Sequence, residues 1–280
     1  DFGKGVSELF NGLYQIIFNF VEEKENLNGM KNILFEHYKD MFRFIKSQYA
    51  NITDSLPGID FLDNKETIND SKYMNLIFSP SPKKNLIKYI PNQNIIYEIN
   101  YSCTYDFDLK INNNPNKKIL FSGIISNIYP HRQEIINNYN NCEDFKLFIE
   151  YISRNQGILK KKYAKCLNNH IASIATPGIV DEDYFIVKKF FEIPCTGSLL
   201  LIFTDKKSII YINKLGFFNN KNCIIATNFK ELQKKIIFIL NDNNKNVIDN
   251  IRKNGKKFVL ENYMVNNTVD KINKIIILHN

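Results

Sequence analysis

The chain has 280 residues, of which 44% are hydrophobic and 24% charged, which is enough to build one large or two modest domains. Its net charge of +8 comes from lysines spread along the chain, so it does not single out a nucleic-acid-binding protein. Five cysteines without a CxxC pair argue against a zinc site or a disulfide framework, and no run of about 18 apolar residues predicts a transmembrane segment. We therefore expect a soluble, cytoplasmic protein.

The N-terminal part of the chain alternates between helical and strand-like patterns. Three helices are expected at residues 6–23, 38–49 and 83–89, and three strands at residues 32–35, 74–78 and 94–99. Such alternation is typical of an α/β protein with a doubly wound parallel sheet.

A polar stretch at residues 100–117 interrupts this alternation. It ends in four asparagines around Pro115, a composition that favours a loop over a regular element. We take it as the linker between two domains and predict their extents as residues 1–110 and 111–280.

The C-terminal domain again alternates between strands and helices. Strands are expected at residues 118–122, 171–175, 198–203 and 223–227. Helices are expected from Pro130 onward and at residues 145–153, 160–167, 187–193, 209–215, 229–240, 246–261 and 265–277.

The most informative stretch runs from residue 188 to residue 201. Glu192 lies on a predicted helix, Gly197 follows five residues later, and an apolar strand comes next. A carboxylate there can accept hydrogen bonds from ribose hydroxyls, and the turn at Thr196 and Gly197 lets backbone amides approach a phosphate. The alternative is a helix-terminal Glu without a ligand.

This stretch resembles the C-terminal domain of group 1 glycosyltransferases of the GT-B fold, whose donor-site signature ends in a Glu, four residues, a Gly and a hydrophobic strand. The resemblance implies two Rossmann-like doubly wound domains and assigns ribose binding to Glu192. In the family another Glu stands eight positions earlier, where this chain has Tyr184. That departure leaves the sugar contacts and the stereochemical class open.

A second point of resemblance lies at residues 121–132, where a strand, a glycine turn and a Tyr-Pro-x-Arg string lead into a helix. A glycine loop before a helix N-terminus is suited to binding an anion, and Arg132 beyond Gly123 is placed to clamp a diphosphate. The alternative for Arg132 is a plain surface residue. We take His131 as a surface histidine.

A third point of resemblance lies at residues 163–176, which in the family hold the nucleobase. Backbone groups from Ser173 to Thr176 are candidates to bind the base, although buried strand packing is the simpler explanation for their side chains. Lys188, one turn before Glu192, is a candidate phosphate partner, with a solvated lysine as the alternative.

The N-terminal half gives fewer indications of chemistry. A complete domain of this class opens with a strand and a glycine-rich turn, whereas this chain begins with Asp1-Phe2-Gly3-Lys4-Gly5 and a predicted helix, so we expect an abbreviated or truncated N-terminal domain. His37 and Asp40 follow a predicted strand, at the sheet edge where such folds bind ligands. They are candidate catalytic residues, with His37 as base toward an acceptor hydroxyl.

Together these features favour a hexosyltransferase that uses a UDP- or GDP-linked sugar and a glycan, lipid or protein hydroxyl as acceptor. We expect no cofactor and no metal, because Asp106-Phe107-Asp108 and Asp181-Glu182-Asp183 are better explained as solvated or turn carboxylates than as a metal-binding DxD motif. One rival is a noncatalytic nucleotide- or glycan-binding module of the same fold. Another is an RNA-binding protein, which would need a contiguous basic face with aromatic platforms that the sequence lacks.

Overall fold

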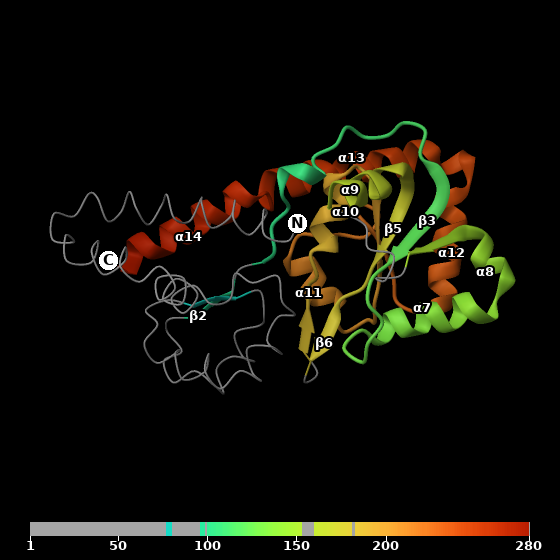
Figure 1. Cartoon of the computed structure of the whole chain (residues 1–280), viewed down its shortest axis with the longest axis horizontal. Coiled ribbons are helices and arrows are strands. Elements are labelled where there is room, and N and C mark those ends of the chain that lie inside the picture. Colours follow the sequence, from blue (N-terminus) through green and yellow to red (C-terminus); the bar gives the residue numbers. More distant parts are fainter. Residues whose placement is uncertain (1–76, 80–95, 99, 153–159, 181–182, 280) are drawn as a thin grey trace.

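A five-stranded parallel sheet forms the centre of the C-terminal part of the chain (Figure 1). The computed structural model describes residues 77–79, 96–98, 100–152, 160–180 and 183–279. The strands are β3 (Asn116–Ser122), β4 (Ile149–Ile152), β5 (His170–Ala175), β8 (Leu199–Phe203) and β9 (Ile224–Ala226), arranged in the order β4-β3-β5-β8-β9. Every neighbouring pair is parallel, which confirms the predicted doubly wound sheet.

Helices cover both faces of the sheet and make a three-layer domain. One layer consists of α7 (Pro130–Asn141), α8 (Glu143–Phe148), α12 (Phe229–Leu240) and the first half of α13 (Lys245–Asn262). The other consists of α9 (Lys160–Asn169), α10 (Lys189–Cys195), α11 (Ile209–Lys214) and the second half of α13. A last helix, α14 (Val265–His279), extends away from the sheet (Figure 1).

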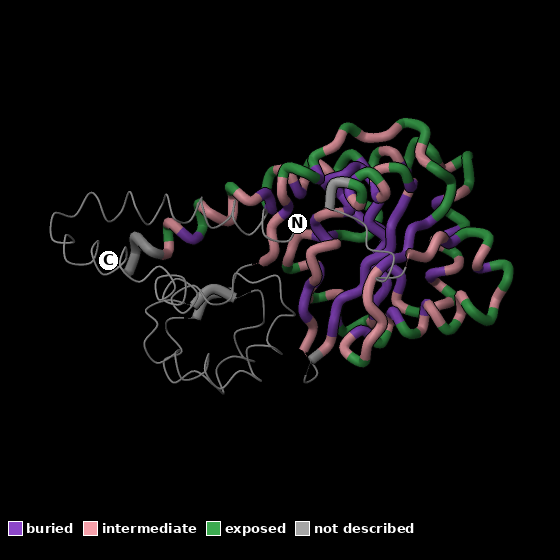
Figure 2. Tube along the Cα trace, viewed as in Figure 1, coloured by how far each residue is buried: buried purple, intermediate pink, exposed green. Residues whose placement is uncertain are grey.

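The two helical layers explain why the strands are apolar without alternation. In β8, Leu200 and Ile202 pack toward one layer, whereas Leu201 and Phe203 pack toward the other. All five residues of this strand are buried, and the buried residues concentrate in the sheet (Figure 2). Parallel strands covered on both faces read as continuous apolar runs, which is the pattern in the sequence.

Two segments differ from the sequence prediction. The helix predicted at residues 145–153 ends at Phe148, and the next four residues form the edge strand β4, because they pair in parallel with β3 from Ile119↔Ile149 onward. Beyond β5, the strands β6 (Gly178–Val180) and β7 (Asp183–Phe185) form an unpredicted antiparallel hairpin. In both places tertiary pairing overrides local sequence preference.

The polar stretch predicted as a linker packs onto the C-terminal domain. The Cys103 amide donates to the Tyr263 carbonyl at 2.7 Å, and the Val265 amide donates to the Cys103 carbonyl at 3.0 Å. Phe107, in the short 3-10 helix η3 (Tyr105–Phe107), is fully buried in the core. Residues 101–109 therefore pack against this domain, while the domain boundary at residues 110–111 stays a prediction.

Little of the N-terminal part is described. The strands β1 (Ile77–Ser79) and β2 (Ile96–Glu98) pair in parallel and overlap the strands predicted at residues 74–78 and 94–99. The helices predicted at residues 6–23, 38–49 and 83–89 and the strand at residues 32–35 lie outside the described residues. In the part of the chain that the structure describes, no helix combines the length and apolar character needed to cross a membrane.

Candidate functional site

The carboxyl ends of the parallel strands share one edge of the sheet, which is where doubly wound folds bind ligands. Ser122 and Gly123 stand at the end of β3, Thr176 follows β5, and Asp205 follows β8. The predicted site residues Gly123, Arg132 and Thr176 therefore meet at one edge, together with the start of α10.

Two cationic side chains converge on Gly123. The residue has a φ of +127°, and a Cβ atom at this position would lie 2.9 Å from the Lys189 Nζ and 3.1 Å from the Arg132 Nη1. Only glycine adopts this backbone conformation without strain and leaves room for both cations. The glycine turn thus permits a close approach of two positive charges to the backbone.

Arg132, in the first turn of α7, is buried and held in place. Its Nε donates to the Thr176 Oγ1 at 3.1 Å, and its Nη1 donates to the Ile124 carbonyl at 3.0 Å. Its guanidinium carbon lies 3.5 Å from the centre of the Tyr129 ring. These contacts join the loop after β3 to the end of β5 and fix the guanidinium before any ligand binds.

Lys189, the first residue of α10, is the second cation, and sequence reasoning missed it. Its Nζ donates to the Ser122 carbonyl and, at 2.9 Å, to the Ser122 Oγ. Burial and repulsion by Arg132 lower the pKa of Lys189 to about 7, although Glu192 opposes the shift. An anion placed beside both cations would return this lysine to its charged form.

Lys188, which the sequence predicts as a phosphate partner, points toward the Tyr101 ring and not toward Gly123. Its Nζ lies 5.5 Å from the centre of the Tyr101 ring, which belongs to the segment that precedes β3. Two adjacent lysines at a helix start face different directions, because successive helical residues are rotated by about 100°. Both lysines stand within one helical turn of Glu192, so the sequence alone does not separate them.

Glu192 lies near Lys189. Burial lowers the pKa of Lys188 and of Lys189, and the Glu192 charge opposes both shifts. Burial raises the pKa of Tyr163, and the Glu192 charge adds to that shift. The Tyr163 hydroxyl is 3.1 Å from the Ser122 Oγ, which links it to the Lys189 ammonium. The predicted carboxylate therefore lies close to the predicted anion site.

The structure does not bring Thr196 and Gly197 to this edge. They follow the carboxyl end of α10 and precede β8, so they lie at the amino edge of the sheet, opposite Gly123. The Thr196 Oγ1 donates to the Ile193 carbonyl at 2.8 Å, and the Gly197 carbonyl accepts from the buried Arg252. The helix α10 runs from the carboxyl edge toward the amino edge of the sheet, and Gly197 lies beyond its far end. The spacing of Glu192 and Gly197 in the sequence does not reveal this separation.

Ser173 is also away from the carboxyl edge. It is buried within β5, and its Oγ lies 3.3 Å from the Ser198 Oγ. Its side chain is buried within the sheet, which agrees with the alternative of buried strand packing. The candidate catalytic residues His37 and Asp40 lie outside the described residues.

His131 is not a surface histidine, contrary to the sequence prediction. Its side chain is 14% exposed, and its Nε2 lies 3.7 Å from the Asp205 Oδ2. Burial lowers the pKa of His131, although Asp205 opposes the shift. The same carboxylate oxygen accepts from the Tyr184 hydroxyl at 2.5 Å, so Asp205 ties the β6–β7 hairpin to the end of β8. The hairpin therefore lies at the carboxyl edge of the sheet.

The two acidic strings considered as metal-binding motifs are residues 106–108 and 181–183. In the first, Asp108 forms an ion pair with Lys256, and Phe107 is buried. In the second, residues 181–182 lie outside the described part. Among the described residues, no group of three or more His, Cys, Asp or Glu side chains is arranged to hold a metal ion.

Comparison with known proteins identifies relatives by structure only. No protein-family model matches the sequence, and no curated protein is detectably similar to it. Among solved structures, Anabaena HepE in complex with UDP-glucose aligns with a TM-score of 0.54 at 9% identity, covering 76% of this chain and 66% of HepE. Sucrose-phosphate synthase from Thermosynechococcus elongatus aligns with a TM-score of 0.53 at 9% identity, covering 79% of this chain and 65% of the synthase.

The pneumococcal O-GlcNAc transferase GtfA, in complex with UDP and GlcNAc, aligns with a TM-score of 0.51 at 9% identity, covering 77% of this chain and 47% of GtfA. The chain thus spans less than two thirds of the length of each of these proteins. At such low identity the alignments establish the architecture. Parallel sheet, helical layers and the aligned structures agree that this chain has the GT-B fold.

Proposed function

We propose that this chain is a glycosyltransferase that transfers a sugar from a nucleotide-sugar donor to a hydroxyl group, and that Arg132 and Lys189 hold the donor diphosphate at Gly123. The observation that carries the proposal is the convergence of these two cations on one glycine at the carboxyl edge of the sheet. Support also comes from the fold, because structures with the same architecture contain UDP or UDP-glucose.

The chemistry of transfer demands such a site. The acceptor oxygen forms a bond to the anomeric carbon, the bond between that carbon and the diphosphate oxygen breaks, and the acceptor hydroxyl gives up its proton. Negative charge then grows on the leaving diphosphate. Cations already held in position stabilise this charge without reorganisation, which is the largest contribution in many enzymes. Lys189 responds to the same charge by becoming fully protonated.

The remaining roles follow from the resemblance. Glu192, beside the cationic pair, binds the ribose hydroxyls, and backbone groups near Thr176 face the base. His37 and Asp40 act on the acceptor side, with a glycan, lipid or protein hydroxyl as acceptor. The donor is a UDP- or GDP-linked hexose, and the cations take the place of a metal ion. Lys188, Ser173, Thr196 and Gly197 have no part in donor binding in this proposal.

Nucleotide binding tests the proposal directly. A ligand that binds only the folded state raises the melting temperature, so UDP or GDP should stabilise the wild-type protein. Arg132→Ala and Lys189→Ala should abolish the rise, whereas Lys165→Ala, on the exposed face of α9, should keep it. If no nucleoside diphosphate raises the melting temperature, the proposed site is wrong.

Turnover distinguishes the enzyme from a noncatalytic binding module. Release of UDP or GDP from the corresponding nucleotide sugars, abolished by Glu192→Ala, supports the transferase. A nucleotide-dependent rise in melting temperature without release from any UDP- or GDP-sugar favours the module.

A further inference from the structure

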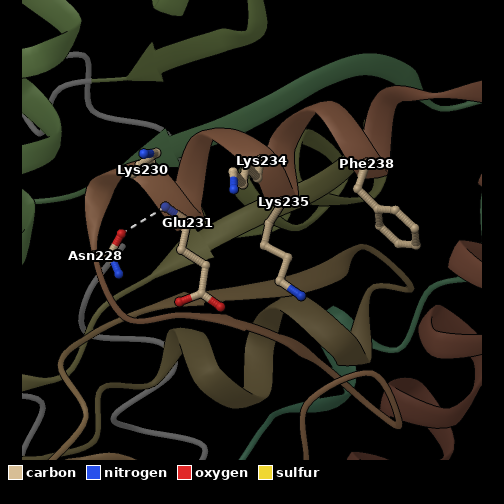
Figure 3. A pocket seen from close by; sticks show the side chains of 6 residues that line it. All are labelled: Asn228, Lys230, Glu231, Lys234, Lys235 and Phe238. Atoms are coloured by element: carbon tan, nitrogen blue, oxygen red, sulfur yellow. Dashed lines mark hydrogen bonds between the residues drawn. The ribbon is translucent and has the colours of Figure 1, made fainter.

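The helix α12 has an unusual outward face. Its core side is formed by Leu232, Ile236 and Ile239, which are buried against the sheet. The opposite side carries lysines in the first half and apolar residues in the second half, with Ile237 58% exposed and Phe238 36% exposed. Figure 3 shows Lys230, Lys234, Lys235 and Phe238 projecting from one helix. These side chains line a shallow hollow of about 650 Å³. We call Lys230, Lys234, Ile237 and Phe238 the basic-apolar face; the half-buried Lys235 flanks it.

The lysines of this face carry charge that the rest of the described structure does not neutralise. Among the described residues none forms an ion pair with Lys230, Lys234 or Lys235. The neighbouring Glu231 is already engaged, because its Oε2 accepts from the Thr227 amide at 2.8 Å and from the Thr227 hydroxyl at 2.9 Å. The three ammonium groups are therefore available to an external anion.

Stability does not explain the position of these residues. Lys230 is the second residue of α12, where the helix dipole disfavours a positive charge. Ile237 and Phe238 expose apolar surface on the side that faces away from the core, which contributes little to folding. Adjacent exposed apolar side chains beside lysines have the composition of an interaction surface.

Other helices of the same layer also carry exposed apolar side chains. Leu147 and Phe148 at the end of α8 are 67% and 37% exposed, and Val247 in α13 is 49% exposed. The helix α8 lies next to α12, because the Phe145 and Phe229 rings are 5.0 Å apart, and both helices lie on the same side of the sheet (Figure 1). The outer surface of this layer thus carries exposed apolar side chains as well as lysines.

We infer that the basic-apolar face binds the surface of an anionic phospholipid bilayer. Helices that lie in a membrane interface combine lysines, which are attracted to anionic headgroups, with apolar side chains that enter the acyl boundary. A protein partner fits less well, because lysine is depleted from protein interfaces. A nucleic acid would use the lysines but leave Ile237 without a counterpart.

This inference is independent of the proposed transfer reaction. The basic-apolar face lies on the outside of a helical layer, whereas Arg132 and Lys189 lie at the carboxyl edge of the sheet. Vesicle binding is measured without any nucleotide, so the failure of one proposal leaves the other intact.

Co-sedimentation of the full chain with lipid vesicles tests the inference. We expect binding to vesicles of equal parts phosphatidylcholine and phosphatidylglycerol, little binding to phosphatidylcholine alone, and loss of binding at high salt. At ~1 kcal/mol per lysine near an anionic surface, the double variant K230Q/K234Q should weaken binding ~30-fold. I237S/F238S should weaken it as well, because the electrostatic attraction then acts without insertion.

The matched control is K165Q/K253Q, which removes two exposed lysines from α9 and α13 and changes the net charge equally. It should bind the anionic vesicles nearly as well as the wild-type protein. Equal loss in this control, equal binding to neutral vesicles, or no vesicle binding at all would overturn the inference. Binding to a sulfated polysaccharide in place of vesicles would also overturn it and would indicate a general polyanion surface.

Discussion

Lys189 should destabilise the free protein even though it prepares the site for an anion, and Lys189→Met separates these two effects. Folding lowers its pKa from 10.5 to about 7. Each pKa unit is worth ~1.36 kcal/mol, so holding this group in the folded state at pH values below 7 is unfavourable by at most ~5 kcal/mol. The residue is partly exposed, and the variant loses the hydrogen bonds to Ser122. We therefore expect a net gain of ~1–3 kcal/mol in the free energy of unfolding.

The pH dependence identifies the cause of this gain. Between about pH 7 and pH 10.5 the unfolded chain holds a proton that the folded chain has released, so the stability of the wild-type protein rises with pH across this window. The Met variant lacks this contribution. Its advantage over the wild-type protein should therefore shrink by up to ~2–3 kcal/mol between about pH 6.5 and about pH 9.

Urea unfolding followed by circular dichroism at the two pH values measures both quantities. Lys165→Met, which removes an exposed lysine of α9, serves as the control and should change stability little at either pH. The reasoning is refuted if Lys189→Met destabilises the protein at both pH values, or if its advantage does not depend on pH. The variant should also lose the rise in melting temperature that UDP or GDP gives the wild-type protein.

Three further predictions follow from particular contacts. Gly123→Ala should lower stability by ~1–3 kcal/mol, because of its positive φ, and should weaken nucleotide binding in calorimetry, because the new Cβ would displace Lys189. Gly197→Ala should lower stability by a similar ~1–3 kcal/mol and leave nucleotide affinity unchanged, since this glycine lies at the opposite edge; a large loss of affinity would contradict that placement. Burial lowers the pKa of His170, but hydrogen bonds to a backbone carbonyl and to Glu150 outweigh it and raise the pKa to about 9. The resulting stabilisation is complete below about pH 6.5 and is lost as pH rises through about 9, so Glu150→Gln should remove ~1 kcal/mol at low pH and flatten this profile in thermal melts.

The sequence predicted the elements wherever a local pattern coincides with the final packing. The apolar run that became β8 is buried on both faces, and the 3.6-residue period of α12 matches the buried Leu232, Ile236 and Ile239. Pro130 marks the start of α7, because proline at the first helical position has no amide hydrogen bond to lose. These features depend on neighbours in the chain, so they are readable without coordinates.

Tertiary structure decided what depends on distant segments. The strand β4 exists because β3 offers it a partner, and nothing in its own four residues separates it from the helix before it. The choice of Lys189 over Lys188 depends on how α10 is rotated against Ser122. Gly197 shares a sequence motif with Glu192 but lies at the other edge of the sheet, because a helix carries the chain from one edge to the other. Local order is encoded by neighbouring residues, whereas a site is assembled from strand ends that only the folded sheet brings together.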